Sequence, residues 1–302
     1  IPVPELLFES ANEPRKNSKG IDLDSPLETV DLLAAVQKKS SDLFTVHSLI
    51  NGFSSGIALQ DHFNPADNNH LLGQYSTVEE EDILQAVESA YSAQPHWDLL
   101  GHLNRADILD TVANSMEQET AEMIAIIASE AGRTLNDGLS EVREAIDFCR
   151  YYALQSRQIS QEQGANYSGR GVFLCISPWN FPLAIFTGQI AAALAAGNAV
   201  IAKPAEQTSI VATIATKLLH QAGVPISSLQ LLPGDGTTVG GRLTSDPRIA
   251  GVCFTGSTST AQLINQAMAK NVDPEAILIA ETGGINAMLV DSTALPEQAI
   301  KD

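Results

Sequence analysis

Short and long apolar segments alternate between residues 172 and 280, and this alternation constrains the fold more than any other feature of the sequence. The short segments predict strands at 172–177, 199–203, 229–232, 251–254 and 276–280. Longer segments with helical spacing lie between them, at 183–196, 208–222 and 258–270. Strands that alternate with helices in this way form a parallel sheet through right-handed crossovers. The sequence therefore predicts an α/β domain with an open parallel sheet.

The residues before this domain show a different sequence pattern. Residues 1–43 mix prolines with a polar run, which is typical of a linker or an extended arm. Residues 44–170 predict helices at 105–116, 120–131 and 138–154, together with a hairpin whose strands are 44–50 and 57–63 and whose turn is Asn51-Gly52. We expect three parts, namely the arm 1–43, a helical part 44–170 with a polar bridging segment, and the sheet domain 171–302.

Composition excludes several classes of function. With 17 basic and 36 acidic side chains, the chain has a net charge of -19, which repels nucleic acid and anionic membranes. The most apolar stretch contains Gln189 and Asn198, which disfavours a membrane span, and the first residues do not form a signal peptide. The three cysteines have neither metal-site nor redox spacing, so we expect no metal and a cytoplasmic location.

Ligands of open parallel sheets bind at the carboxyl ends of the strands, so the residues after each predicted strand are the candidates for chemistry. Asn180 follows the first strand in a loop with two prolines, and its amide either donates hydrogen bonds to a ligand or serves only in a turn. Lys203 and Glu206 follow the second strand. Their cation and carboxylate suit a nucleotide ribose and favour NAD over NADP, while a surface salt bridge is the alternative.

The remaining strand ends carry glycines and hydroxyls. Gly236 follows the third strand, where the spacing does not fit a dinucleotide fingerprint and indicates a phosphate loop only weakly. The run from Phe254 to Ser257 leaves a strand and opens a helix, so it predicts either a pyrophosphate site or an ordinary helix cap. Glu281 follows the last strand in Glu-Thr-Gly-Gly, which suits a general base but also a plain connection.

Taken together, Ser-Pro-Trp-Asn-Phe-Pro, Lys-Pro-Ala-Glu-Gln-Thr, Phe-Thr-Gly-Ser-Thr and Glu-Thr-Gly-Gly resemble the aldehyde dehydrogenase superfamily in order and spacing. The resemblance implies a Rossmann-like sheet of the aldehyde dehydrogenase type, preceded by an arm and a helical segment. It also implies that Asn180 donates to an oxyanion and that Glu281 activates water. The NAD-binding residues that it implies are Ser177, Trp179, Lys203, Glu206, Gly236, Phe254, Thr255, Gly256, Ser257 and Gly283.

A narrower resemblance rests on Thr282, on the run Ala294-Leu295-Pro296-Glu297-Gln298 and on the segment after Asn17, which are similar to the pyrroline-5-carboxylate dehydrogenase part of the proline utilization A family. It implies oxidation of glutamate semialdehyde to glutamate, with Glu144 and Phe181 in the substrate pocket. It further implies a homo-oligomeric parent protein, with FAD only in a separate proline dehydrogenase module.

The resemblance also implies a nucleophilic cysteine in a Gly-Gln-x-Cys segment beyond Glu281, and we expect this cysteine and the catalytic domain to lie outside the 302 residues. Cys149, Cys175 and Cys253 fall inside predicted helices and strands, so we interpret them as packing residues. Two alternatives remain open: another semialdehyde dehydrogenase, and a nucleotide-binding module that has no turnover in isolation.

Overall fold

The computed structural model describes residues 15–39, 42–56, 59–163 and 167–301. Its centre is a seven-stranded sheet with strand order β10-β9-β6-β7-β8-β2-β3. The strands in that order are Ile277–Thr282, Ile249–Gly256, Val172–Ile176, Ala199–Lys203, Leu229–Leu231, Ser48–Ile50 and Phe53–Ser55. The strands from β10 to β8 are all parallel, which confirms the α/β prediction, and β2 and β3 add an antiparallel edge.

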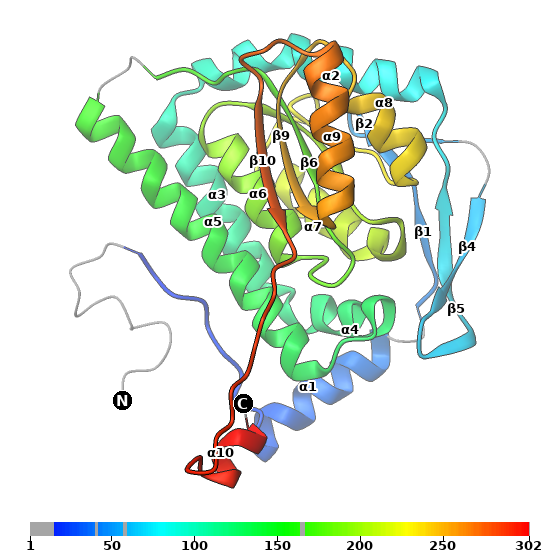
Figure 1. The fold of residues 1–302 in the computed structure, drawn as a ribbon, viewed down its shortest axis with the longest axis vertical. Helices are drawn as coiled ribbons and strands as arrows, with labels where there is room; N and C mark the ends of the chain where they lie inside the picture. The colour runs from blue at the N-terminus through cyan, green and yellow to red at the C-terminus, as the bar shows by residue number, and fades with distance from the viewer. Residues whose placement is uncertain (1–14, 40–41, 57–58, 164–166, 302) are drawn as a thin grey trace.

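The strand order reverses direction next to β6. From β6 the chain moves to β7 and β8 on one side, and it then returns to build β9 and β10 on the other side. The loops that follow β6 and β9 therefore diverge, which opens a crevice at the carboxyl ends of these two strands. In Figure 1 these strands run side by side with their arrowheads at the same end of the sheet.

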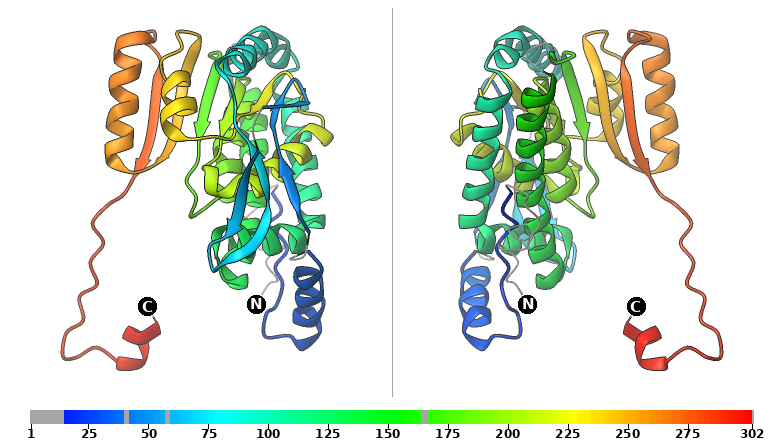
Figure 2. Two further views of the ribbon diagram at one scale, coloured as in Figure 1. Left: turned by 90° about the vertical axis from the view of Figure 1, so that its right-hand side faces the viewer. Right: turned by 90° about the vertical axis from the view of Figure 1, so that its left-hand side faces the viewer.

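Two layers of helices cover the sheet (Figure 2). Alternate strand residues point into two separate apolar clusters, because successive side chains of a strand face opposite sides. The first face packs against α3, α4, α5, α6 and α7, which span His102–Gln118, Thr120–Ala131, Leu135–Gln163, Ala184–Ala195 and Ser209–Gln221. The second face packs against α2, α8 and α9, which span Glu80–Leu99, Gly241–Leu243 and Thr258–Asn271.

The predicted hairpin needs a correction. Asn51 and Gly52 do form the turn, with φ values of 52° and 77°, as a two-residue hairpin loop requires. Such a tight turn pairs the residues on either side of it directly, so β2 pairs with β3 rather than with a strand at 57–63. The strand β4, Leu59–Asn64, instead pairs with β5, Asp67–Ser76, and β1, Phe44–Val46, completes this second, three-stranded sheet.

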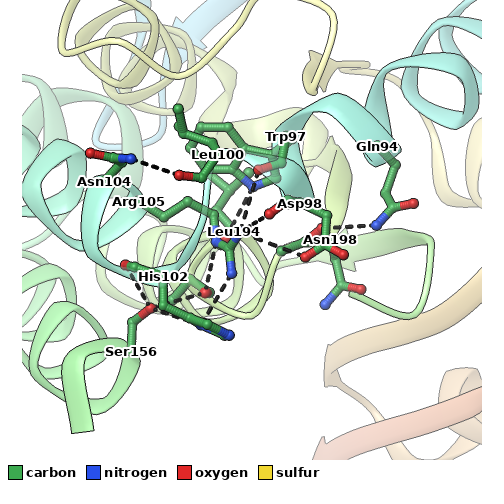
Figure 3. Close-up of polar contacts among 12 residues, drawn as sticks. Gln94, Trp97, Asp98, Leu100, His102, Asn104, Arg105, Ser156, Leu194 and Asn198 are labelled. Carbon is green, nitrogen blue, oxygen red and sulfur yellow. Dashed lines mark hydrogen bonds and ion pairs between the residues drawn. The ribbon is translucent and has the colours of Figure 1, made fainter. Parts of the chain in front are cut away.

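A buried arginine of α3 joins the end of α6 to the end of α2. Arg105 of α3 is 0% exposed, and its Nε donates to the carbonyl of Ala195, at the end of α6, over 3.1 Å. Its Nη1 donates to the carbonyl of Asp98 over 2.6 Å, and the indole of Trp97 donates to the carbonyl of Leu194 over 3.0 Å (Figure 3). The last carbonyls of a helix have no partner within the helix, so these donors terminate α6 and fix its direction.

The described part of the arm lies against α5. The backbone N–H and the hydroxyl of Ser18 both donate to the carboxylate of Asp147, and Arg150 donates to the carbonyl of Asn17. The helix α1, Pro26–Lys39, then packs against α4. The part of the predicted arm at 1–14 lies outside the described residues, and the expected three-part division of the chain stays a prediction.

The end of the chain leaves the sheet after β10. Residues 283–295 form neither helix nor strand, and the short helix α10, Pro296–Lys301, follows them at a distance from the sheet (Figures 1 and 2). None of the helices within the described ranges is both long enough and apolar enough to cross a membrane.

Candidate active site

A cavity of about 1020 Å³ lies at the carboxyl ends of β6, β7, β9 and β10, where the strand order reverses. Its volume is at the upper end of the range for small-molecule and cofactor sites. Twelve of the residues that the sequence singles out line this cavity: Ser177, Trp179, Asn180, Phe181, Lys203, Glu206, Phe254, Thr255, Gly256, Ser257, Glu281 and Gly283.

Two other predicted residues lie elsewhere. Gly236 lines a neighbouring cavity of about 350 Å³ between α9 and the turn Gly236–Gly240, and the side chain of Lys203 borders both cavities. Glu144 lines neither of these two cavities. The helix α5 instead contributes Phe148 and Tyr152 to the wall of the large cavity, one and two turns further along. The catalytic and binding roles of all these residues stay predictions.

Lys203 and Glu206 form a pair at the end of β7. The Nζ atom of Lys203 lies 3.7 Å from the carboxylate of Glu206 and donates to the carbonyl of Pro204 over 3.0 Å. Burial lowers the pKa of Lys203, and the carboxylates of Glu206 and Asp235 oppose this shift. The lysine side chain is 4% exposed, whereas that of Glu206 is 35% exposed. Lys203 therefore lies beside one oxygen of the carboxylate, the amide of Gln207 donates to the other over 3.4 Å, and the carboxylate stays partly accessible to hydroxyl groups in the cavity.

The turn between β9 and α9 places a helix N-terminus at the cavity wall. Ser257 is the N-cap residue of α9, and its hydroxyl accepts from the backbone N–H of Thr260 over 3.1 Å. This observation supports the helix-cap interpretation, but the helix dipole and the free N–H groups of the first turn also favour an anion at this position. Gly283 follows the neighbouring strand β10, and a Cβ atom added there would meet no other atom within 4 Å, so this residue leaves open space in the cavity wall.

Glu281 lies in β10 rather than after it. The predicted strand ends at residue 280, but β9 continues to Gly256 and pairs with Thr282, which extends β10 by two residues. Glu281 therefore sits at the carboxyl end of the strand, opposite Thr255 in the register. Its side chain is exposed and lines the cavity, as does the exposed amide of Asn180 from the loop after β6.

The surroundings shift the pKa values of two acidic groups, Glu144 and Asp235, in opposite directions. The protein around Glu144 removes part of its hydration, which raises the pKa of that carboxyl above its ordinary value. At Asp235, N–H groups of Thr238 and Thr237 donate to the carboxylate and lower its pKa. Asp235 thereby caps the turn at Gly236, a role that the sequence reasoning missed.

Gln189 is a second residue that the sequence reasoning did not select. It lies on α6, and its amide donates to the carbonyl of Ile176 over 3.3 Å and to the hydroxyl of Thr255 over 3.2 Å. It thereby connects the ends of β6 and β9 across the crevice and lines the cavity. A polar residue in the middle of an otherwise apolar helix is the signal that could have identified it.

All three cysteines of the sequence are buried and unpaired, which confirms their interpretation as packing residues. Burial raises the pKa of Cys149 to about 12. Cys175 and Cys253 are partners in the register of β6 and β9. A hydrogen bond from the thiol of Cys175 to the sulfur of Cys253, together with burial, raises the pKa of Cys175 well above its ordinary value, and the same hydrogen bond lowers the pKa of Cys253. Cys253 is 8% exposed and forms part of the cavity wall.

Comparison with known proteins decides the family. A family model described as "Aldehyde dehydrogenase family" matches residues 54–302. The chain belongs to the aldehyde dehydrogenase family. Among its curated relatives, the bifunctional protein PutA of Klebsiella aerogenes is 43% identical over 305 residues, which cover 100% of this chain and 23% of that protein. The 1-pyrroline-5-carboxylate dehydrogenase of Bacillus mycoides is 37% identical over 79% of this chain and 49% of that protein.

Solved aldehyde dehydrogenase structures share the fold. The 1-pyrroline-5-carboxylate dehydrogenase from Thermus with bound NAD superimposes with a TM-score of 0.84 at 28% identity, over 90% of this chain and 56% of that one. This aldehyde dehydrogenase chain thus spans less than a quarter of the PutA protein and about half of the shorter dehydrogenases that it matches.

Proposed function

We propose that this chain is the nucleotide-binding part of a longer enzyme that oxidises L-glutamate γ-semialdehyde, the open form of pyrroline-5-carboxylate, to L-glutamate with NAD. Membership of the aldehyde dehydrogenase family supports the reaction class. The relatives named PutA and 1-pyrroline-5-carboxylate dehydrogenase support the substrate. We further propose that the enzyme acts in the cytoplasm as a homo-oligomer.

One observation carries this proposal: segments from the ends of four parallel strands meet in one cavity at the switch point of the sheet. The cavity brings a ribose-binding pair and an anion site together with an amide and a carboxylate that can take part in chemistry. A chain that used Lys203 and Glu206 only as a surface salt bridge would have no reason to bury the lysine almost completely beside a cavity of this size.

The residues of the cavity fit NAD. Glu206 can accept the two hydroxyls of the adenosine ribose, and it would repel the 2'-phosphate of NADP. The first turn of α9, capped by Ser257, can hold the pyrophosphate. The buried hydroxyl of Ser177 has no hydrogen-bond partner among the described residues and lines the same cavity, so it is available to a ligand. NAD, when bound here, would accept a hydride from the substrate.

Asn180 and Glu281 are the two groups of this chain that we assign to the chemistry. When a thiolate attacks the aldehyde, the oxygen of the aldehyde becomes an oxyanion, and the amide of Asn180 can donate a hydrogen bond to it. The thioester that remains must react with water. The carboxylate of Glu281 can take a proton from that water, because it is exposed in the same cavity.

We propose that the nucleophilic cysteine comes from a segment outside these 302 residues. Cys149 and Cys175 are buried and have raised pKa values, and Cys253 is only 8% exposed inside β9, where it is the register partner of Cys175, so none offers the accessible thiolate that nucleophilic attack requires. The isolated chain is then a nucleotide-binding module without turnover. This second function applies only to the chain on its own and not to the enzyme that contains it.

The test compares the full-length enzyme with the isolated chain. NADH formation is followed by absorbance with pyrroline-5-carboxylate and, separately, with succinate semialdehyde, which represents the other semialdehyde dehydrogenases. We expect the full-length enzyme to prefer pyrroline-5-carboxylate in kcat/KM and the isolated chain to form no NADH. A preference for the other semialdehyde would refute the substrate, and turnover by the isolated chain would refute the external nucleophile.

A further inference from the structure

The loop that carries Asn180 has little support of its own. It runs from Ser177 to Leu183 between β6 and α6, and its two prolines have no N–H groups to donate. The side chains of Asn180 and Phe181 are exposed, so burial in the core does not fix this part of the loop. At its beginning, the N–H of Ser177 donates to the carbonyl of Lys203 over 3.3 Å. Other contacts must set the direction of the Asn180 side chain.

Arg133 supplies the first of these contacts. The helix α4 ends at Ala131, and its C-cap residue Gly132 has a left-handed φ of 66° that redirects the chain toward the loop. The Nη1 atom of Arg133 donates to the backbone carbonyl of Asn180 over 2.9 Å, and its guanidinium carbon lies 4.7 Å from the centre of the Phe181 ring. The arginine therefore holds the loop by its backbone and leaves the amide of Asn180 free.

Glu141 supplies the second contact. It lies on α5 and is 1% exposed, and its Oε1 atom accepts from the backbone N–H groups of Leu183 and Ala184 over 2.9 and 3.3 Å. These N–H groups belong to the beginning of α6, where a carboxylate is favoured by the helix dipole. The loop is therefore held on both sides of Pro182 by residues from the corner between α4 and α5.

We propose that Arg133 is a positioning residue that aims the amide of Asn180 at the developing oxyanion, from a loop whose other end is held by Glu141. This inference rests on the proposed function, in which Asn180 is the oxyanion donor. Neither residue lines the large cavity, so both act through the loop rather than on the substrate. A lysine at position 133 could not replace the arginine fully, because a single ammonium group cannot both donate to the carbonyl and cover the Phe181 ring.

Steady-state kinetics of the full-length enzyme with NAD and pyrroline-5-carboxylate test this proposal with the variants R133M, N180A and R133M/N180A. Removal of an oxyanion donor lowers kcat by roughly 100-fold, and a misplaced donor should cost less, about tenfold for R133M, with the KM for NAD unchanged. In the N180A background, R133M should change kcat by less than about twofold, because the group that it positions is gone.

The matched control is R157M. Arg133 lies 4.0 Å from the carboxylate of Asp137, and Arg157 likewise pairs with the carboxylates of Asp107 and Asp110, at 2.6 and 2.8 Å. The side chain of Arg157 is 31% exposed, compared with 22% for Arg133. It lies on α5 away from the loop, so R157M should keep the wild-type kcat. The conservative variant R133K should fold even where R133M does not, and it should lower kcat by about threefold and have no effect in the N180A background.

The outcomes separate the two levels of the proposal. A wild-type kcat in N180A would remove Asn180 from catalysis and the positioning role with it. If N180A is slow, a wild-type kcat in both R133M and R133K would overturn the positioning role and leave the proposed function intact. Multiplicative losses in the double variant would do the same, because they would show that Arg133 affects the rate independently of Asn180.

Discussion

Replacing Glu206 by glutamine should shift the coenzyme preference of the full-length enzyme toward NADP. Two unit charges 4 Å apart interact by about 4 kcal/mol at an effective dielectric constant of 20. Glu206 is 35% exposed, so solvent screens part of this repulsion, and about 2 kcal/mol remains for a 2'-phosphate at the ribose position. This corresponds to roughly a 30-fold rise in the ratio of kcat/KM for NADP to that for NAD.

The assay measures kcat/KM for NAD and for NADP by the absorbance of NADH and NADPH, with E275Q as the control. Glu275 is exposed at the opposite end of β10, so its replacement changes the net charge equally without touching the cavity. Glutamine retains an oxygen that accepts ribose hydroxyls, so the KM for NAD should rise only a few-fold. A ratio in E206Q equal to that in E275Q would refute the assignment of Glu206 to the ribose.

Three further predictions concern stability and the second half of the reaction. R105M should lower the free energy of unfolding by about 3–5 kcal/mol, because it leaves buried backbone carbonyls without their donor; a change below about 1 kcal/mol in urea unfolding would contradict this. Burial raises the pKa of Asp246, but hydrogen bonds from Arg248 outweigh it and hold the pKa below the ordinary 3.8. The carboxylate therefore stabilises the fold above pH 3.8 and loses this effect as the pH falls through the lowered value, so D246N should show a shallower loss of stability in that range. E281A should slow thioester hydrolysis more than hydride transfer, which a stopped-flow burst of NADH would reveal; slow turnover without a burst would exclude this role.

The parallel part of the fold could be predicted from the sequence because its signals are local. The strand Ala199–Lys203 was predicted with its observed bounds, since Gly197 and Pro204 mark both of its ends. The strand β5 was missed because its first residues, Asp67 to His70, are polar and show no alternation. That strand forms through pairing with β4, and such pairing leaves little trace in a single strand.

The residues of the site also fall into those that local sequence signals predict and those that they do not. Lys203 and Glu281 lie at the carboxyl ends of β7 and β10, and Ser257 directly follows β9, so the topology of a parallel sheet predicts that they meet, and the structure brings them to one cavity. Arg133 and Glu141 act through residues more than 40 positions away in the chain, and no local pattern indicates which backbone groups they contact. Sequence reasoning finds the groups that face a ligand more easily than the groups that hold them.

The two edge strands of the large sheet, β3 and β10, differ in length and exposure, and this difference bears on the aggregation of the isolated chain. At one edge, β3 has three residues and presents little backbone to a neighbour. At the other, β10 has six residues, pairs on one side only among the described strands, and exposes Ile279 by 49%. An exposed edge strand of this kind is a template for pairing with another molecule. We therefore expect aggregation of the isolated chain to begin at β10, and a lysine in place of Ile279 to reduce it.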